Sequence, residues 1–267
     1  MNYAQFIEPI VDLARQAGDA ILEVYASDFD VQSKDDESPL TQADLAAHRR
    51  IVAGLAELTP DVPVISEEGG LPPFEKRGRW PTYWLIDPLD GTRDFVNRNG
   101  EFTVNIALVN DGRPVLGVVH VPVLQKTYVG CEGHGAELRA DGEPPRPIRV
   151  AGNSARPVRV VGSRSHRGSS LDAFIEKLGD CELVPMGSSL KFCVVAEGGA
   201  DVYPRLGPTS EWDTAAAQAV VEQAGGSVLT LDGKPMKYNQ KEDILNPYFM
   251  VIGATDHDWL ALLPDGE

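Results

Sequence analysis

The stretch WLIDPLDGT at residues 84–92 carries the densest chemical signal in the sequence. An apolar strand ends in Asp87, and Asp90 follows, with Pro88 fixing the backbone between them so that both carboxylates can face one point. Two carboxylates with the carbonyl of Leu89 between them suit Mg²⁺, which prefers oxygen ligands. The alternative is an ordinary acidic turn in which Asp90 caps a helix.

At the end of this stretch, Gly91 and Thr92 lead into an expected helix start at residues 93–98. The first turn of a helix presents unpaired N–H groups and the positive end of its dipole to an anion. The sequence therefore predicts a phosphate-binding turn beside the metal ligands.

Two further acidic segments lie at the ends of expected elements. Glu67 and Glu68 follow a strand predicted at 62–66, and Asp213 opens an alanine-rich helix predicted at 213–226. Each has a simple alternative, since the two glutamates fit a solvated strand end and Asp213 fits an N-cap. Their combination with the paired aspartates predicts one shared metal site.

The rest of the first half favours helices and one sheet. Helices are expected at 3–25 and 41–58, with Thr41 as the N-cap of the second, and 69–79 is expected to be a loop. Residues 87–95 are expected to form a turn and helix start. Strands are predicted at 82–87, 102–109, 114–123, 127–132 and 135–140, with a hairpin turn at 110–112 and a connecting loop at 142–148.

From about residue 156 strands and helices alternate. Strands are expected at 157–165, 182–187, 200–206 and 227–231, the last being the final strand, and helices at 170–179, 190–199 and 213–226. We therefore predict an α/β (α+β) protein in two halves. Residues 1–155 form an α+β half with most metal ligands, and residues 156–267 form an α/β half with Asp213 and the nucleotide-recognition residues.

Composition limits the possible functions. A formal net charge of −16 over 267 residues disfavours polymeric nucleic acid as a partner, because its binding needs a basic surface. Three cysteines without a C-x-x-C pair argue against disulfides and a thiolate zinc site. The N-terminal residues show amphipathic spacing rather than a secretory signal, and no apolar run could span a bilayer, so we expect a soluble, cytoplasmic protein.

Other catalytic arrangements lack their signatures. The five histidines are scattered, without a pair at metal spacing or a Ser/His/Asp set. Neither a P-loop nor a G-x-G-x-x-G precedes a helix, so triphosphate and dinucleotide binding are not indicated. Hydrolysis of a phosphate monoester needs charge neutralisation and a positioned nucleophile, which two metal ions about 3.5–4 Å apart provide.

DPLDGT at 87–92 and WDTAA at 212–216 resemble the lithium-sensitive, Mg²⁺-dependent phosphatase superfamily of inositol monophosphatase, and the resemblance covers nearly the whole chain. Within it, the sequence is most similar to bacterial 3′(2′),5′-bisphosphate nucleotidases of the CysQ type. The runs that carry this finer resemblance are SPLTQAD (38–44), RNGEFTVNIAL (98–108), GSSLKFC (187–193), YPRLGPT (203–209) and EWDTAA (211–216). The resemblance implies a layered αβαβα sandwich and inhibition by Li⁺.

The resemblance also implies the metal ligands. Glu67 and Asp87 would bind one metal ion, together with the Leu89 carbonyl. Asp87, Asp90 and Asp213 would bind a second, with two or three Mg²⁺ ions per site.

Catalytic roles follow in the same way. Asp44 and Thr92 would orient the attacking water, with Asp44 accepting its proton through the Thr92 hydroxyl and Glu67 sharing in catalysis. The residues expected around the scissile phosphate are Glu67, Leu89, Asp90, Gly91, Thr92 and Asp213.

A second phosphate on the substrate would need cations away from the metal site. The candidates are Arg164, His166, Lys191 and Arg205, although Lys191 and Arg205 also fit solvated surface residues. Residues Gly187, Ser188 and Ser189 precede Lys191 at an expected strand-to-helix junction and match the family's nucleotide-specificity segment. Tyr203 and Trp212 could pack against a base, but such aromatic residues more often belong to the core.

The predicted reaction removes the 3′-phosphate from adenosine 3′,5′-bisphosphate to give AMP and phosphate, which links it to sulfate assimilation. An inositol monophosphatase or a sugar bisphosphatase fits the same metal core. A non-catalytic regulator that binds a phosphorylated nucleotide is the alternative from another class, and the Asp44–Thr92 pair argues against it. Monomer and homodimer both stay open, as does a peripheral position on the cytoplasmic face of the inner membrane.

Overall fold

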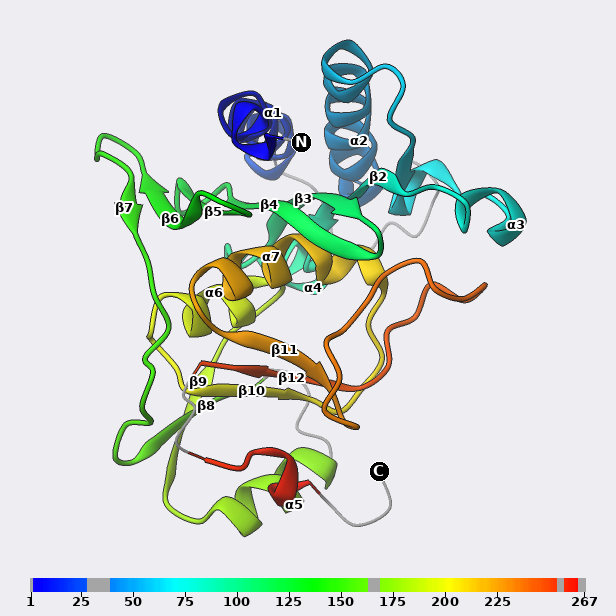
Figure 1. The fold of residues 1–267 in the computed structure, drawn as a ribbon. Helices are drawn as coiled ribbons and strands as arrows, with labels where there is room; N and C mark the ends of the chain where they lie inside the picture. Colours follow the sequence, from blue (N-terminus) through cyan, green and yellow to red (C-terminus); the bar gives the residue numbers. More distant parts are fainter. Residues whose placement is uncertain (1, 28–38, 163–168, 254–256, 264–267) are drawn as a thin grey trace.

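Helical layers and sheets alternate in the computed structural model, which describes residues 2–27, 39–162, 169–253 and 257–263 (Figure 1). The layers, from one face to the other, are helices α1 (Ile7–Tyr25) and α2 (Pro39–Leu58), a seven-stranded sheet, helices α6 (Leu190–Ala196) and α7 (Ala215–Gln223), a five-stranded sheet, and helix α5 (Ser169–Leu178). This arrangement confirms the layered αβαβα prediction.

The first sheet holds seven strands side by side in chain order. They are β1 (Val64–Ser66), β2 (Thr82–Asp90), β3 (Thr103–Asn110), β4 (Arg113–Val121), β5 (Lys126–Cys131), β6 (Gly135–Ala140) and β7 (Arg146–Pro147). Strands β1 and β2 pair in parallel, and the remaining neighbours pair antiparallel. The predicted hairpin turn joins β3 to β4, with Asp111 and Gly112 both at positive φ.

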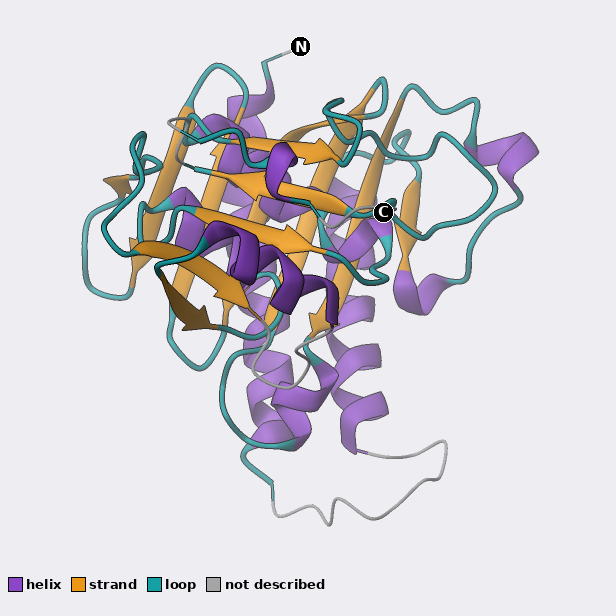
Figure 2. Cartoon of the chain, turned by 90° about the horizontal axis from the view of Figure 1, so that it is seen from below, coloured by secondary structure: helices purple, strands orange, loops and turns teal. Residues whose placement is uncertain are grey.

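The second sheet has the order β11-β12-β10-β8-β9. Its strands are β8 (Val158–Gly162), β9 (Cys181–Pro185), β10 (Val202–Arg205), β11 (Ser227–Thr230) and β12 (Phe249–Ile252). Strand β8 is parallel to both of its neighbours, and β12 is antiparallel to both of its own. Its strands run across those of the first sheet (Figure 2).

Helix α7 lies between the sheets and packs against β3, β4 and β5. Two glycines permit this close approach, because a Cβ on Gly117 would lie 2.1 Å from the carbonyl oxygen of Ala216. A Cβ on Gly130 would lie 2.5 Å from the carbonyl oxygen of Ala219. The packing fixes the short 3₁₀ helix η3 (Glu211–Asp213), which precedes α7 and contacts β2.

Several sequence predictions about element bounds were wrong. Helix α2 begins at Pro39 rather than at a Thr41 cap, since proline is well suited to the first turn of a helix. Strand β2 continues through Asp87 to Asp90, with a register irregularity between them, where a turn was expected. The expected loop at 69–79 contains the one-turn helix α3 (Phe74–Arg77).

Two short strands were also missed. The expected loop at 142–148 contributes β7, and β12 follows the strand that was expected to be final. Both are defined by pairing with distant strands, and a run of two to four residues carries little periodicity of its own. The two sheets draw on residues 64–147 and 158–252, and the division of the chain into halves at residue 155 stays a prediction.

Two predictions from composition can be compared with the described residues. All three cysteines are free thiols, with Cys131 and Cys193 buried. Within the described residues, no helix combines the length and the apolar character needed to cross a membrane.

Candidate active site

Three carboxylates converge where the first sheet meets helix α7. Glu67 opens the 3₁₀ helix η2 (Glu67–Gly69) directly after β1, Asp87 lies in β2, and Asp213 ends η3. One carboxylate oxygen from each of the three lies within 4.8 Å of the others. Asp87 is 1% exposed, and its Oδ1 accepts the backbone N–H of Leu89 at 3.0 Å. The structure therefore brings together three of the four predicted carboxylate ligands.

The cluster is electrostatically strained when it holds no cation. Burial raises the pKa of Asp87 well above its usual range, and the charges of Asp90, Glu67 and Asp213 raise it further. Burial, followed by the charge of Asp90, raises the pKa of Asp213 to about 8, and burial also raises the pKa of Glu67. Carboxylate oxygens held this closely fit a hard divalent cation, which would relieve their repulsion.

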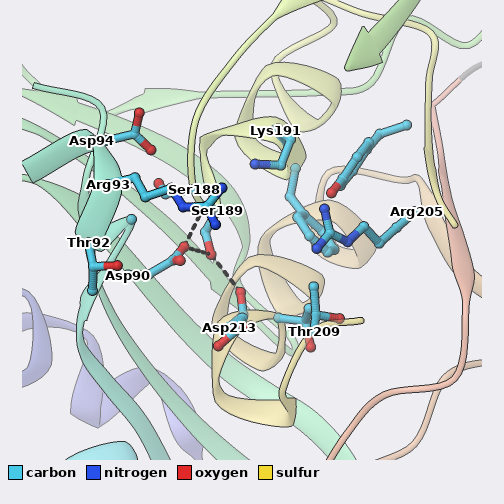
Figure 3. A pocket seen from close by; sticks show the side chains of 14 residues that line it. Asp90, Thr92, Arg93, Asp94, Ser188, Ser189, Lys191, Arg205, Thr209 and Asp213 are labelled. Carbon is cyan, nitrogen blue, oxygen red and sulfur yellow. Dashed lines mark hydrogen bonds between the residues drawn. The ribbon is translucent and has the colours of Figure 1, made fainter. Parts of the chain in front are cut away.

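Asp90 lies beside this cluster and is held by other bonds. Its Oδ2 accepts the backbone N–H of Ser189 at 2.6 Å and lies 2.9 Å from the Ser189 hydroxyl (Figure 3). The Thr103 hydroxyl is 3.4 Å away. Burial raises the pKa of Asp90, whereas the charge of Lys191 and the bonds from Ser189 lower it. In the described part of the chain, Asp90 is not one of the three clustered carboxylates.

Ser189 connects the two sides of the site. Its Oγ also lies 2.6 Å from the backbone carbonyl of Asp213, and it accepts the side-chain N–H of Asn105 at 2.9 Å. It is the N-cap residue of α6, and 2% of it is exposed. Ser189, a predicted substrate contact, therefore already binds Asp90 and the Asp213 turn with its amide and hydroxyl.

Asp213 is held by a capping box rather than acting as the N-cap itself. The Ser210 backbone N–H donates to the Asp213 carboxylate at 2.9 Å, and the Ser210 side chain accepts the N–H of Asp213. Ser210 is the N-cap of η3, and Thr214 is the N-cap of α7. Asp213 is therefore the N3 residue of a capping box and not an N-cap.

Asp44 lies in α2, which packs against both η2 and the short helix α4 (Thr92–Val96). It is 7% exposed, and its Oδ1 has no hydrogen-bond partner within the described ranges. Burial, followed by the charges of Glu68 and Glu67, raises the pKa of Asp44 to about 8. Thr92 is the exposed first residue of α4, and its pairing with Asp44 around a water molecule stays a prediction.

A cavity of about 330 Å³ opens beside Asp90 and Asp213. Lys191 and Arg205 lie across it from Asp90 (Figure 3). The Lys191 ammonium is 5.9 Å from the ring centroid of Tyr203, and burial lowers its pKa while the charge of Asp90 raises it. Arg205 donates to the carbonyls of Gly207 at 3.1 Å and Pro208 at 2.6 Å, which hold its guanidinium in place.

The other predicted contacts surround the same cavity. Gly91 has φ of 91°, which favours glycine, and a Cβ there would lie 3.0 Å from the Ser188 side chain. Gly91, Thr92 and Ser188 line the cavity, whereas the Gly187 N–H already donates to Glu101 at 2.7 Å. Arg164 and His166 lie outside the described residues. Tyr203 also lines the cavity, and Trp212 packs against the core.

Sequence reasoning missed several residues here. Arg93, Asp94, Thr209 and Thr214 also line the cavity. Thr103 and Asn105, which support Asp90 and Ser189, carried a detectable signal. They are polar residues two positions apart at the start of a strand that continues with four apolar residues, so both face the same side.

The alternating layers, with a carboxylate cluster beside a cavity that also presents Lys191 and Arg205, define an α/β protein suited to hold a divalent cation next to an anion. The model of the inositol monophosphatase family matches residues 2–257, and the chain belongs to this family.

Within this family, the chain is similar to proteins named as bisphosphate nucleotidases. The chain is 50% identical over 247 residues to the 3′(2′),5′-bisphosphate nucleotidase CysQ of Escherichia coli K12. The aligned region covers 92% of this chain and 98% of that protein. It is 37% identical over 257 residues to the protein of the same name from Haemophilus influenzae, with 96% of each chain covered.

The chain also resembles solved structures of the family. The crystal structure of CysQ from Bacteroides thetaiotaomicron matches with a TM-score of 0.84 at 42% identity, covering 92% of this chain and 96% of that one. An inositol monophosphatase from Zymomonas mobilis matches with a TM-score of 0.79 at 23% identity, covering 98% of both chains. The second likeness concerns the fold alone.

Proposed function

We propose that this chain is a Mg²⁺-dependent 3′(2′),5′-bisphosphate nucleotidase that converts adenosine 3′,5′-bisphosphate to AMP and phosphate. This reaction would be linked to sulfate assimilation. The observation that carries the proposal is a cavity with Asp90 and Asp213 on one side and Lys191 and Arg205 on the other, next to the carboxylate cluster of Glu67, Asp87 and Asp213. The relatives that match nearly all of the chain are named for the same activity.

The metal site would use Glu67, Asp87 and Asp213, with Asp90 and the Leu89 carbonyl as further proposed ligands. Their oxygen donors and mutual repulsion suit Mg²⁺. When bound, Mg²⁺ would supply positive charge to the phosphoryl oxygens and Lewis-acid activation of the attacking water.

Asp44 would accept the proton of the attacking water, with the Thr92 hydroxyl orienting that water. A general base works best when its pKa lies near the operating pH. In the metal-free protein the pKa of Asp44 is raised to about 8, and its unpartnered Oδ1 leaves an acceptor available.

Lys191 and Arg205 would bind the phosphate that is not cleaved. Two cations away from the metal cluster suit a substrate with two separated phosphates, because each anionic group then meets positive charge. An inositol monophosphate has no second phosphate for Lys191 and Arg205 to bind, so the geometry favours the nucleotide.

The proposed reaction is tested by incubating the protein with adenosine 3′,5′-bisphosphate and Mg²⁺ and identifying the nucleoside monophosphate that forms. We expect AMP, with no phosphate release when EDTA removes the metal. Formation of adenosine 3′-phosphate would contradict the proposed orientation, and nucleotide binding without turnover would favour the regulator.

The general base is tested with Asp44→Asn at saturating Mg²⁺. We expect kcat to fall about 10²–10⁴-fold, the usual contribution of such a group, with little change in KM. The exposed Asp61→Asn is the control and should behave as wild type. Unchanged phosphate release in Asp44→Asn would show that Asp44 is not the base.

A further inference from the structure

Residues 238–246, which we call the strap, connect the first sheet to the turn that carries Asp213. At one end, the Tyr238 N–H donates to the carbonyl of Gly112, in the turn between β3 and β4, at 3.0 Å. At the other end, the Asn246 side chain donates to the carbonyl of Ser210 at 2.7 Å. In Figure 1 the strap lies in the orange segment between β11 and β12, on the same side of the molecule as α3.

Arg77 anchors the middle of the strap. It is 0% exposed, and among the described residues no carboxylate forms an ion pair with it. Its guanidinium donates to four neutral acceptors, which are the carbonyls of Pro72, Lys241 and Glu242 and the side-chain oxygen of Asn239. A buried guanidinium is costly unless its donors are satisfied, so this charge fixes where the strap must lie.

Asn239 links Arg77 to Glu211 through hydrogen bonds. Its side-chain N–H donates to the Arg77 carbonyl at 2.7 Å, and its backbone N–H donates to the Glu211 carboxylate at 2.8 Å. It adopts φ of 57°, a conformation that asparagine tolerates better than most residues. Glu211 is 2% exposed, and its N–H donates to the Ile244 carbonyl at 2.9 Å.

Glu211 and Asp213 are the first and last residues of η3. The bonds therefore run from Arg77 through Asn239 to the turn that presents the Asp213 carboxylate. Asp87 lies in β2 and Glu67 directly follows the neighbouring strand β1, but Asp213 comes from a distant part of the chain. Contacts within the protein must therefore hold Asp213 beside Glu67 and Asp87 before a cation binds.

We propose that Arg77 is a positioning residue, which acts through Asn239 and Glu211 to hold Asp213 opposite Glu67 and Asp87 and so sets the affinity of the site for divalent cations. This rests on the metal dependence of the proposed function and does not depend on its substrate.

The test is calorimetric titration with Mn²⁺, without nucleotide, on wild type, Arg77→Lys and Asn239→Gly. Arg77→Lys keeps the charge and loses the fork of donors, while Asn239→Gly keeps the backbone bond to Glu211 and tolerates the positive φ. Arg79→Ala is the matched control, since Arg79 is exposed in the same segment. Tm in EDTA and kcat at saturating Mg²⁺ are measured on the same samples.

We expect the Kd for Mn²⁺ to rise at least about tenfold in both variants, as for other residues that orient metal ligands, and to stay unchanged in Arg79→Ala. At saturating Mg²⁺, kcat should return to within about threefold of wild type. A lower Tm with the wild-type Kd would overturn the proposal by showing a purely structural role. Asn239→Gly decides the matter if Arg77→Lys does not fold. Preference of the wild type for inositol phosphate would refute the proposed substrate and leave the positioning role standing.

Discussion

The two sides of the site, which we call the carboxylate wall (Glu67, Asp87 and Asp213) and the cationic wall (Lys191 and Arg205), are built differently. On the carboxylate wall, β1 and β2 pair in parallel with Ser66 opposite Ile86, which places the following residues, Glu67 and Asp87, side by side. The opposite wall takes Lys191 from a helix and Arg205 from the end of a strand in the other sheet. A register of hydrogen-bonded strands is strongly constrained, whereas side chains at helix starts and strand ends can be exchanged.

The proposed function assigns different tasks to these two walls. The Zymomonas mobilis inositol monophosphatase keeps the fold at 23% identity, so the layers tolerate extensive substitution. We infer that the carboxylate wall supplies the chemistry and that the cationic wall selects the substrate. Changes to the first should affect every substrate, and changes to the second should affect only some.

The largest effect is expected from Asp213→Asn. The amide keeps an oxygen that can accept the Ser210 N–H but removes a charge from the cluster. We expect kcat/KM to fall about a thousandfold for every phosphomonoester, about 4 kcal/mol at the transition state. Asp232→Asn removes an exposed carboxylate outside the site and serves as the control. A fall in kcat/KM for one substrate alone would contradict the hypothesis that the carboxylate wall supplies the chemistry for every substrate.

A smaller and selective effect is expected from Lys191→Met. A hydrogen bond to a charged group contributes about 1.5–3 kcal/mol, so kcat/KM for adenosine 3′,5′-bisphosphate should fall about 10–100-fold. Any residual turnover of inositol 1-phosphate should be nearly unchanged, and Lys237→Met, at an exposed position, should match wild type. An equal loss for both substrates would place Lys191 in the chemical machinery instead.

The smallest effect concerns the stability of the metal-free protein. The pKa values of Asp44 and Asp213 are raised to about 8 in the folded state, against 3.8 for the unperturbed side chain. Between these values the folded state binds more protons than the unfolded state, so stability must decrease as the pH rises. We expect Tm in EDTA to fall by several degrees from pH 5.5 to 8.5 and Mg²⁺ to reverse the fall. A Tm in EDTA that does not vary with pH would show that the carboxylates are not crowded as described.

Much of the carboxylate wall was predictable because its signals are local. The aspartates of the 84–92 stretch, Glu67 at a strand end and Asp213 before an alanine-rich helix all mark the ends of recognisable elements. The resemblance to the family added the expected roles and the layered fold. Even so, the sequence did not show that Asp90 accepts its bonds from Ser189, because these two residues lie 99 positions apart in the chain.

The parts that were missed depend on long-range contacts. Strand β12 is defined by its place between β10 and β11, which no local pattern specifies. Arg77 and Asn239 lie in segments that look like ordinary polar loops, and only folding brings them together. Buried charge in a loop is visible only once its hydrogen-bond partners are known.

The division between the two walls is tested most directly by comparing kcat/KM for adenosine 3′,5′-bisphosphate, inositol 1-phosphate and fructose 1,6-bisphosphate with Mg²⁺. We predict a preference of about a hundredfold or more for the nucleotide, nearly 3 kcal/mol of discrimination at the transition state. Equal rates, or a preference for inositol 1-phosphate, would contradict the proposed role of Lys191 and Arg205 and leave only the metal chemistry standing.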